Sequence, residues 1–249
     1  MTADGKGPLL DVAGISKQFG GVRAVDDCSL TVSPRTITGL IGPNGSGKTT
    51  VFNIITGFVA PDVGVINFRG RPITGLSPGD VYRLGIGRTF QMARVFGRLT
   101  VRENLLLPVR RTGLRGFFGG FHGADERDAA SEMLDKLHLS HVAGEPVGRL
   151  SYGQRRLVEL GTLMMTRPQL VLLDEPAAGV NPALVESLAS YIVSLNADGV
   201  SFLIVEHDLN FVMGICHDLV VLDRGRHIAQ GPPAEIRARQ SVIDAYLGD

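Results

Sequence analysis

A glycine-rich run around a single lysine constrains this sequence more than any other feature. Residues 42–50 are Gly-Pro-Asn-Gly-Ser-Gly-Lys-Thr-Thr, which satisfies the pattern G-x-x-x-x-G-K-[ST]. The apolar segment 37–41 precedes the run and a helical pattern over 49–56 follows it, as the motif requires. The chain has only four lysines, so a chance match is roughly a one-in-a-hundred event. The run therefore predicts a phosphate-binding loop between a strand and a helix.

Each residue type in this loop has a chemical use. Glycines let successive backbone N–H groups converge on phosphate oxygens, and the following helix adds its positive end. Lys48 would bind the β- and γ-phosphates, and the Thr49 hydroxyl would coordinate Mg²⁺. The cofactors expected from this loop are therefore ATP and Mg²⁺. The expected nucleotide-binding residues are Gly42, Pro43, Asn44, Gly45, Ser46, Gly47, Lys48, Thr49 and Thr50.

The pattern of apolar residues predicts an α/β core around the loop. Residues 170–173 and 201–205 are continuous apolar runs, typical of strands buried on both faces, and 182–195 is a helical pattern between them. Shorter β-like runs fill 9–32, and 62–75 has the glycines of a small hairpin. Together these segments indicate a parallel sheet accompanied by antiparallel strands.

The middle of the chain has a different character, because helical patterns dominate from 91 to 154. Within it, Ala130, Met133, Leu134 and Leu137 repeat at the spacing of one helix face. The predicted fold class is thus α/β, with a P-loop NTPase core, an antiparallel β subdomain and an inserted helical subdomain. In one domain over 1–249, we assign 1–90 and 158–230 to the core with its β subdomain, 91–157 to the helical subdomain and 231–249 to a C-terminal helix.

Two adjacent acids, Asp174 and Glu175, follow the apolar run 170–173. Carboxylates at the end of a buried parallel strand lie beside the loops that follow the neighbouring strands. Asp174 would hold Mg²⁺ through water, in the Walker B role, and Glu175 would act as the general base on the attacking water. The alternative is a helix start that merely favours acidic residues. Beside the phosphate loop, we favour the catalytic interpretation.

The segment Leu150-Ser151-Tyr152-Gly153-Gln154 precedes a helical pattern over 155–166. Ser151 and Gln154 form an S-x-x-Q capping box, so one interpretation is simply a well-made helix start. The other is that the serine hydroxyl and the Gly153 N–H present donors to a phosphate. Capping alone does not distinguish the two.

Two single polar residues complete the candidates. Gln91 opens the helical block, and His207 follows the run 201–205 at the sheet edge expected for Asp174. A lone glutamine or histidine is usually a surface or core residue. Their placement at strand ends next to the phosphate loop favours function instead.

Composition excludes several other classes. Lys and Arg total 25 and Asp and Glu total 25, so no excess of positive charge points to nucleic acid. Cys28 and Cys216 match neither a metal-binding spacing nor a disulfide framework. The first seven residues lack the basic and apolar regions that are expected of a signal peptide, and no apolar run approaches the ~18 residues needed to span a bilayer. We expect a cytosolic chain.

The motifs resemble those of the nucleotide-binding subunit of ATP-binding cassette transporters across essentially the whole chain. Their order along the chain is the basis of the resemblance: Phe19, the phosphate loop, Gln91, residues 150–154, Asp174, Glu175 and His207. The resemblance implies that Phe19 stacks on adenine, that Gln91 contacts Mg²⁺ or the attacking water, and that His207 holds the γ-phosphate and positions Glu175. It also implies that two such subunits pair head to tail. Each ATP would then lie between the phosphate loop of one chain and Ser151, Gly153 and Gln154 of the other.

Within that family the chain is most similar to the larger ATPase of branched-chain amino acid uptake systems. The stretches that carry this are 19–21, 88–91, 150–154, 174–179 and 245–248. The resemblance implies ATP hydrolysis on the cytoplasmic side of the cell membrane, with permease subunits, a sister or identical ATPase and, indirectly, a solute-binding protein as partners. Alternatives are a urea or short-amide importer ATPase, a lipid or lipopolysaccharide extraction ATPase, and a soluble non-transport cassette ATPase.

Two residues depart from the motifs of the wider family, and one long stretch has two possible roles. Tyr152 replaces the first glycine of the usual signature sequence, and Asn181 stands where aspartate is commoner after Walker B. The resemblance implies that Asn181 affects signalling between the two sites rather than hydrolysis. The Gly-, Arg- and Phe-rich stretch 110–123 is expected to be a long loop, either a tolerated insertion or a contact with the permease or membrane.

Overall fold

The computed structural model describes residues 7–90, 95–108 and 124–247, which form two compact units. The α/β unit consists of Met1–Arg88, Gln169–Pro176 and Val193–Asp249, and the helical unit consists of Thr89–Pro168 and Ala177–Ile192. No helix among these described stretches is long and apolar enough to cross a membrane.

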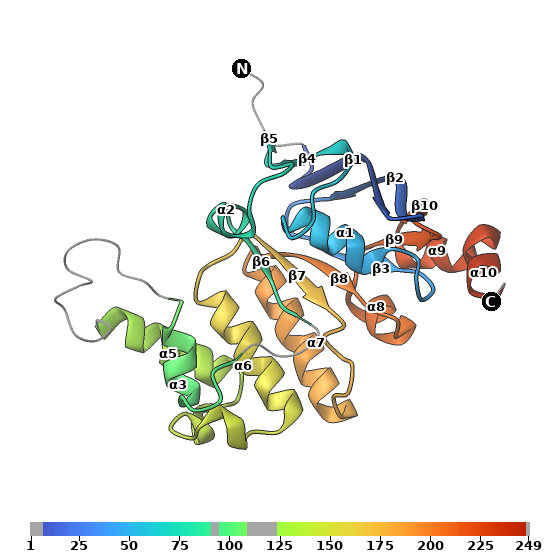
Figure 1. Cartoon of the computed structure of the whole chain (residues 1–249). Coiled ribbons are helices and arrows are strands. Elements are labelled where there is room, and N and C mark those ends of the chain that lie inside the picture. Colours follow the sequence, from blue (N-terminus) through green and yellow to red (C-terminus); the bar gives the residue numbers. More distant parts are fainter. Residues whose placement is uncertain (1–6, 91–94, 109–123, 248–249) are drawn as a thin grey trace. The chain divides into compact units, whose positions relative to one another are not determined.

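A six-stranded sheet in the order β10-β9-β3-β8-β7-β6 is the centre of the α/β unit (Figure 1). Neighbouring strands of this sheet are parallel, except that β10 is antiparallel to β9. Every residue of β3, β7 and β8 is buried, which for β7 and β8 confirms the expectation from their apolar runs. The strands are β3 (Ile37–Ile41), β6 (Ile86–Arg88), β7 (Leu170–Asp174), β8 (Ser201–Val205), β9 (Asp218–Asp223) and β10 (Arg226–Gly231).

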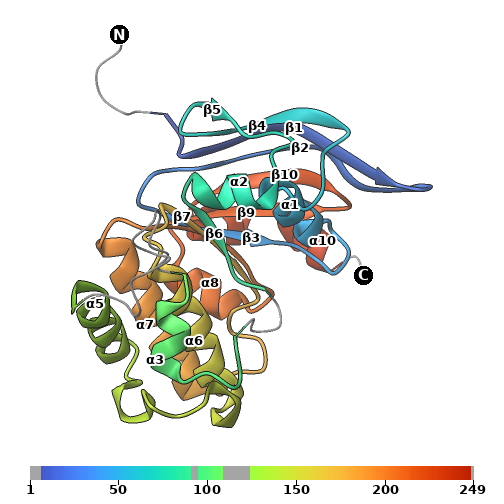
Figure 2. The same ribbon diagram turned by 60° about the vertical axis from the view of Figure 1, so that its left-hand side comes forward.

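A second, antiparallel sheet of the same unit has the order β2-β1-β4-β5. Helix α1 (Lys48–Ile55) lies between the two sheets (Figure 2), and its Phe52 is completely buried in the core that both sheets share. The expected antiparallel subdomain is therefore confirmed. Its strands are β1 (Leu10–Phe19), β2 (Val22–Val32), β4 (Val63–Phe68) and β5 (Arg71–Pro72).

Three elements of the α/β unit differ from expectation. Helix α2 (Pro78–Arg83) and the short strand β6 were not predicted, because neither is long enough to show a period. The single terminal helix expected from Pro233 onward is two helices, α9 (Pro233–Ala238) and α10 (Gln240–Leu247). The extended backbone of Arg239, with φ −77° and ψ 124°, separates them.

The helical unit contains α3 (Val101–Leu106), α5 (Ala124–Lys136), α6 (Tyr152–Met164) and most of α7 (Pro182–Ala197). Of the predicted helix face, Ala130, Leu134 and Leu137 are buried. Helix α6 is continuous, so the boundary expected between residues 157 and 158 falls inside a helix. The stretch 110–123 lies outside the described residues.

Candidate functional site

The phosphate loop connects β3 to α1, as the sequence predicts. Gly42, Gly45 and Gly47 have φ values of 149°, 77° and 98°, in the region that a side chain makes costly. Helix α1 begins at Lys48 with Gly47 as its N-cap. The first backbone N–H groups of α1 therefore point toward the loop, which is the arrangement that binds an anion.

Two neighbouring segments brace the loop. A Cβ on Gly42 would lie 2.1 Å from the carbonyl oxygen of Leu222, and one on Gly47 would lie 2.5 Å from that of Ala24. In addition, the N–H of Gly225 donates to the carbonyl oxygen of Ser46 over 3.0 Å. The shape of the loop thus depends on β2 and on the turn between β9 and β10, which are both remote in the sequence.

An ion pair ties these two bracing segments to each other. The N–H of Asp26 donates to the carbonyl oxygen of Gly225 over 2.8 Å, and Arg226 donates from Nε (2.8 Å) and Nη2 (2.7 Å) to Oδ2 of Asp26. Arg23 donates to the other oxygen over 2.9 Å. The hydrogen bond from Arg226, followed by that from Arg23, holds the pKa of the Asp26 carboxyl below its usual range. Sequence patterns gave no sign of this cluster.

Lys48 is buried and points back over its own loop. Its Nζ donates to the carbonyl oxygens of Gly42 and Pro43, each over 2.8 Å. Burial lowers the pKa of Lys48, while the negative charges of Glu175 and Asp174 act in the opposite direction. The loop lysine and the two predicted carboxylates therefore share one electrostatic environment.

Asp174 and Glu175 stand where β7 ends. Asp174 is 7% exposed, whereas Glu175 adopts a left-handed backbone with φ 48°. That conformation costs a non-glycine residue about 1 kcal/mol or more, and here the Glu175 N–H donates to the carbonyl oxygen of Val205 over 2.9 Å. The backbone of the predicted general base is thus held by the neighbouring strand β8.

His207 lies at the same sheet edge, because β7 and β8 run in parallel with Asp174 opposite Val205. Its side chain is 64% exposed, and its backbone N–H donates to the buried carboxylate of Glu206 over 3.1 Å. Phe19 ends β1 with 48% of its surface exposed, and the Lys17 ammonium lies 5.6 Å from its ring centroid. Gln91 lies outside the described residues.

In the helical unit, Ser151 is the N-cap of α6. Its side chain accepts from the N–H of Gln154 over 3.3 Å, and the Gln154 side chain accepts from the N–H of Ser151 over 3.0 Å. The capping interpretation is therefore confirmed, and the phosphate interpretation stays a prediction. Gly153 packs closely, since a Cβ there would lie 2.7 Å from Cδ1 of Leu184.

Sequence analysis missed a buried cluster one turn further along α6. Arg156 and Glu159 are 5% and 7% exposed, and their side chains approach within 3.4 Å. Oε1 of Glu159 accepts from the N–H of Phe90 over 3.3 Å, while Arg156 donates to the Phe90 carbonyl oxygen. The Arg156 guanidinium also lies 5.4 Å from the ring of Tyr152. The start of α6 and the residue before Gln91 are thereby joined.

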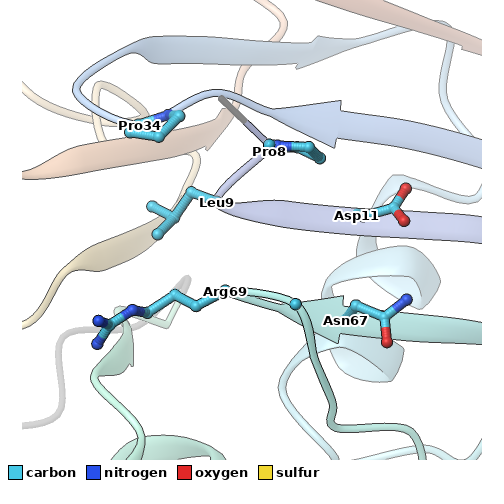
Figure 3. Close-up of a pocket in the computed structure, with 8 residues that line it drawn as sticks. Pro8, Leu9, Asp11, Pro34, Asn67 and Arg69 are labelled. Atoms are coloured by element: carbon cyan, nitrogen blue, oxygen red, sulfur yellow. The ribbon is translucent and has the colours of Figure 1, made fainter. Parts of the chain in front are cut away.

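A separate hollow of about 650 Å³ lies beside the antiparallel sheet (Figure 3). It shares no residue with the phosphate loop or with the two carboxylates. The labelled residues around it are Pro8, Leu9, Asp11, Pro34, Asn67 and Arg69.

Comparison with known proteins gives concordant matches. A family model described as "ABC transporter" matches residues 25–178, and one described as "Branched-chain amino acid ATP-binding cassette transporter" matches residues 226–249. The high-affinity branched-chain amino acid transport ATP-binding proteins BraF of Pseudomonas aeruginosa and LivG of Escherichia coli are 41% and 40% identical to the chain. Both matches cover 97% of this chain and 98% of the relative.

Among solved structures, the ADP conformation of an ATP-binding cassette of an ABC transporter matches with a TM-score of 0.86 and 35% identity. The match covers 98% of this chain and 100% of that one. A nucleotide-free ATP-binding cassette from an ABC transporter matches with a TM-score of 0.85, also at 35% identity, over 97% and 100% of the two chains.

Proposed function

The chain belongs to the ABC transporter family of ATP-binding cassettes, and on that premise we propose that it drives the import of branched-chain amino acids by hydrolysing ATP. The observation that carries the proposal is that the phosphate loop with Lys48 follows β3 while Asp174 and Glu175 stand at the end of β7, in the parallel part of one sheet. The solute is inferred from the names of the relatives that match nearly the whole chain.

Nucleotide binding is assigned to the phosphate loop and to Phe19. The backbone N–H groups of residues 44–50 and the Lys48 ammonium would hold the phosphates, for which Lys48 exchanges its two carbonyl acceptors for phosphate oxygens. Phe19, half exposed at the tip of the β1–β2 hairpin, offers an exposed ring for adenine. Discrimination among nucleotides would come from this ring rather than from the loop.

Magnesium binding is assigned to Thr49, Asp174 and Gln91. No cluster of three or more His, Cys, Asp or Glu side chains suited to a metal exists among the described residues. Mg²⁺ suits the observed donors nonetheless, because it binds one or two carboxylates together with phosphates and water. The Thr49 side chain is exposed in the first turn of α1, and Asp174 is buried at the end of β7, where its charge acts on Lys48. When bound, the ion neutralises charge that develops on the phosphates.

Hydrolysis is assigned to Glu175 with His207. The Glu175 carboxylate takes a proton from water as the water oxygen attacks the γ-phosphorus, and the bond from that phosphorus to the ADP oxygen breaks. The products are ADP and inorganic phosphate, so the proton held by Glu175 is released with or after the phosphate. The His207 side chain, 64% exposed next to β8, would hold the γ-phosphate and position Glu175.

A second cassette chain is needed to complete the site. Ser151 and Gln154 form the capping box of α6, and the Ser151 hydroxyl and the Gly153 N–H are further donors at the N-terminus of that helix. We assign these donors to the ATP held by the phosphate loop of a partner cassette. The ATP-bound state is then a closed dimer, and hydrolysis reopens it; a sister subunit is the favoured partner.

Permease contact is assigned to the segment around Val95 and Phe96, and it would place the chain at the cytoplasmic side of the membrane. Phe96 is 63% exposed, yet the buried Asn104 side chain binds both its N–H (2.8 Å) and its carbonyl oxygen (3.1 Å). An exposed aromatic ring on such a fixed backbone suits a docking surface for a helix. Crosslinking from Phe96 to the permease in an active complex tests this assignment, and absence of any crosslink would contradict it.

The decisive experiment compares Glu175→Gln with the unchanged chain in Mg-ATP. A glutamine cannot accept the proton, so turnover is expected to fall by about 100-fold or more while ATP stays bound in a stable dimer. Glu235→Gln, at an exposed glutamate in the first turn of α9, is the control. A monomer that hydrolyses ATP normally would refute the role of Glu175.

A second experiment identifies the solute. The permease that co-purifies with the chain is reconstituted, and transport of valine is compared with transport of urea.

A further inference from the structure

We propose that Arg88 is a positioning residue for magnesium binding, which fixes the Asp174 carboxylate to the helix that carries Lys48 and Thr49. The inference rests on the magnesium role proposed above for Asp174. Arg88 ends β6, and its backbone pairs with Leu172 of β7, two residues before Asp174. The two side chains therefore meet at the same end of neighbouring strands.

The contact between the two is a buried ion pair. Nη2 of Arg88 lies 3.0 Å from Oδ2 of Asp174, and the two side chains are 7% and 9% exposed. Among the described residues, Oδ1 of Asp174 accepts no hydrogen bond. The guanidinium thus fixes the carboxylate through one oxygen and leaves the other available to a water on a metal ion.

The same guanidinium is attached to α1. Its Nη1 donates to Oδ1 of Asn53 over 2.7 Å and to Oγ1 of Thr56 over 3.1 Å. Asn53 lies within α1 and Thr56 is the C-cap of that helix. Lys48 and Thr49 form the first turn of α1. Arg88 therefore fixes the position of the Asp174 carboxylate relative to the helix that carries these two residues.

Aromatic rings fix the arginine in place. Its Cζ lies 5.6 Å from the ring centroid of Phe52 and 5.8 Å from that of Phe58. A planar guanidinium can bind three acceptors and contact two rings at once, whereas a lysine ammonium has neither the plane nor the fork. Ordinary charge balance would need only the Asp174 contact, so the ties to α1 indicate a positioning role.

The test measures how much Mg²⁺ strengthens nucleotide binding. A non-hydrolysable ATP analogue is titrated calorimetrically against the full chain, once with Mg²⁺ and once with EDTA. In Arg88→Gln the affinity in EDTA should stay within about twofold, while the gain from Mg²⁺ should fall roughly tenfold, as for other groups that orient a metal ligand. Arg88→Lys should recover only part of the gain.

Arg83→Gln is the matched control, because it removes an Arg–Asp pair of 2.6 Å from the exposed surface of α2. Its gain from Mg²⁺ should equal that of the unchanged chain. An undiminished gain in folded Arg88→Gln would overturn the role of Arg88 alone, and so would an equal loss of affinity with and without Mg²⁺. If the unchanged chain itself shows no gain from Mg²⁺, the magnesium role of Asp174 falls as well.

A second variant covers the case in which Arg88→Gln does not fold. Asn53→Ala keeps the Arg88–Asp174 pair and releases the guanidinium from one of its acceptors on α1. Its gain from Mg²⁺ should fall by about threefold, a smaller effect than removal of the guanidinium itself. No change in Asn53→Ala and in Arg88→Lys together would overturn the proposal.

Discussion

The backbone N–H of Phe90 donates a hydrogen bond of 3.3 Å to Oε1 of Glu159, a buried carboxylate in the middle of α6. Arg156, one turn earlier on the same helix, donates to the carbonyl oxygen of Phe90. The backbone of a single residue is thus held at both of its polar groups by two buried charges. That residue immediately precedes Gln91, and the helix that holds it has the signature residue Ser151 as its N-cap.

Replacing Glu159 by glutamine should destabilise the chain markedly. The amide removes the buried negative charge that lies 3.4 Å from Arg156, and loss of one partner of a buried ion pair costs about 3–5 kcal/mol. Urea unfolding at neutral pH measures the effect. Glu132→Gln is the control, because its pair with Lys136 spans 3.1 Å on an exposed face of α5 and should contribute less than about 1 kcal/mol. Equal losses in the two variants would contradict the importance of the cluster.

Gly42 of the phosphate loop and Gly70 of the turn between β4 and β5 should differ in their tolerance of alanine. Gly42→Ala places a Cβ 2.1 Å from a backbone oxygen of β9, so it should abolish nucleotide binding and lower the melting temperature strongly. Gly70→Ala, with φ 71° and open space around it, should cost only about 1–2 kcal/mol of backbone strain and leave binding intact. Thermal unfolding and nucleotide titration of both variants check this. If the two variants lose similar amounts of stability and affinity, the close contact with Leu222 is not the reason that position 42 requires glycine.

The brace at Asp26 should lose its effect in acid. Its folded pKa lies below 3.8, chiefly because of the hydrogen bond from Arg226, so its contribution to stability is complete above that value. As pH falls below 3.8, the unfolded carboxyl binds its proton first, and the contribution disappears as pH passes the lower folded pKa. The urea midpoints of the unchanged chain and of Asp26→Asn should therefore differ at neutral pH and converge in acid. A difference that persists at the lowest accessible pH would contradict this.

Asn181 should be replaceable by aspartate. Its Oδ1 accepts from the N–H of Leu184 over 2.9 Å at the start of α7, and an aspartate oxygen can do the same. Asn181→Asp should keep or raise stability by about 0.3–1 kcal/mol, because a negative charge suits a helix N-terminus. Asn181→Ala should lose about 1 kcal/mol. Denaturant unfolding of the two variants tests whether capping is the only contribution of Asn181 to stability. A large loss of unfolding free energy in Asn181→Asp would show that it is not.

Local motifs explain what the sequence predicted well. The phosphate loop, the strands β3, β7 and β8, and the acids at the end of β7 each have their signal within a few consecutive residues. Strand–loop–helix order and apolar runs depend on backbone geometry that neighbouring residues determine. The cap at Ser151 was visible for the same reason.

The contacts that position the site left no such local signal. Arg88 and Asp174, Phe90 and Glu159, and Ser46 and Gly225 meet across long separations, and no period relates the members of these pairs. The strand β6 has three residues and takes its conformation from β7 beside it. Tertiary pairing of this kind overrides local preference, so only the folded chain shows it. Gln91 and the stretch 110–123 stay predictions, because they lie outside the described residues.

The place of β3 in its sheet has a consequence for synthesis. Both strands that flank it, β8 and β9, are made long after it, and so is Gly225, whose N–H binds the loop. At roughly 5–20 residues per second, a ribosome completes the phosphate motif on the order of ten seconds before it makes those neighbours. In the meantime the nascent chain carries an apolar strand with two open edges, where unintended pairing begins. Nucleotide binding is thus a late event of translation. A ribosome that stalls between the phosphate motif and β8 leaves a chain that contains the motif but cannot bind nucleotide with it.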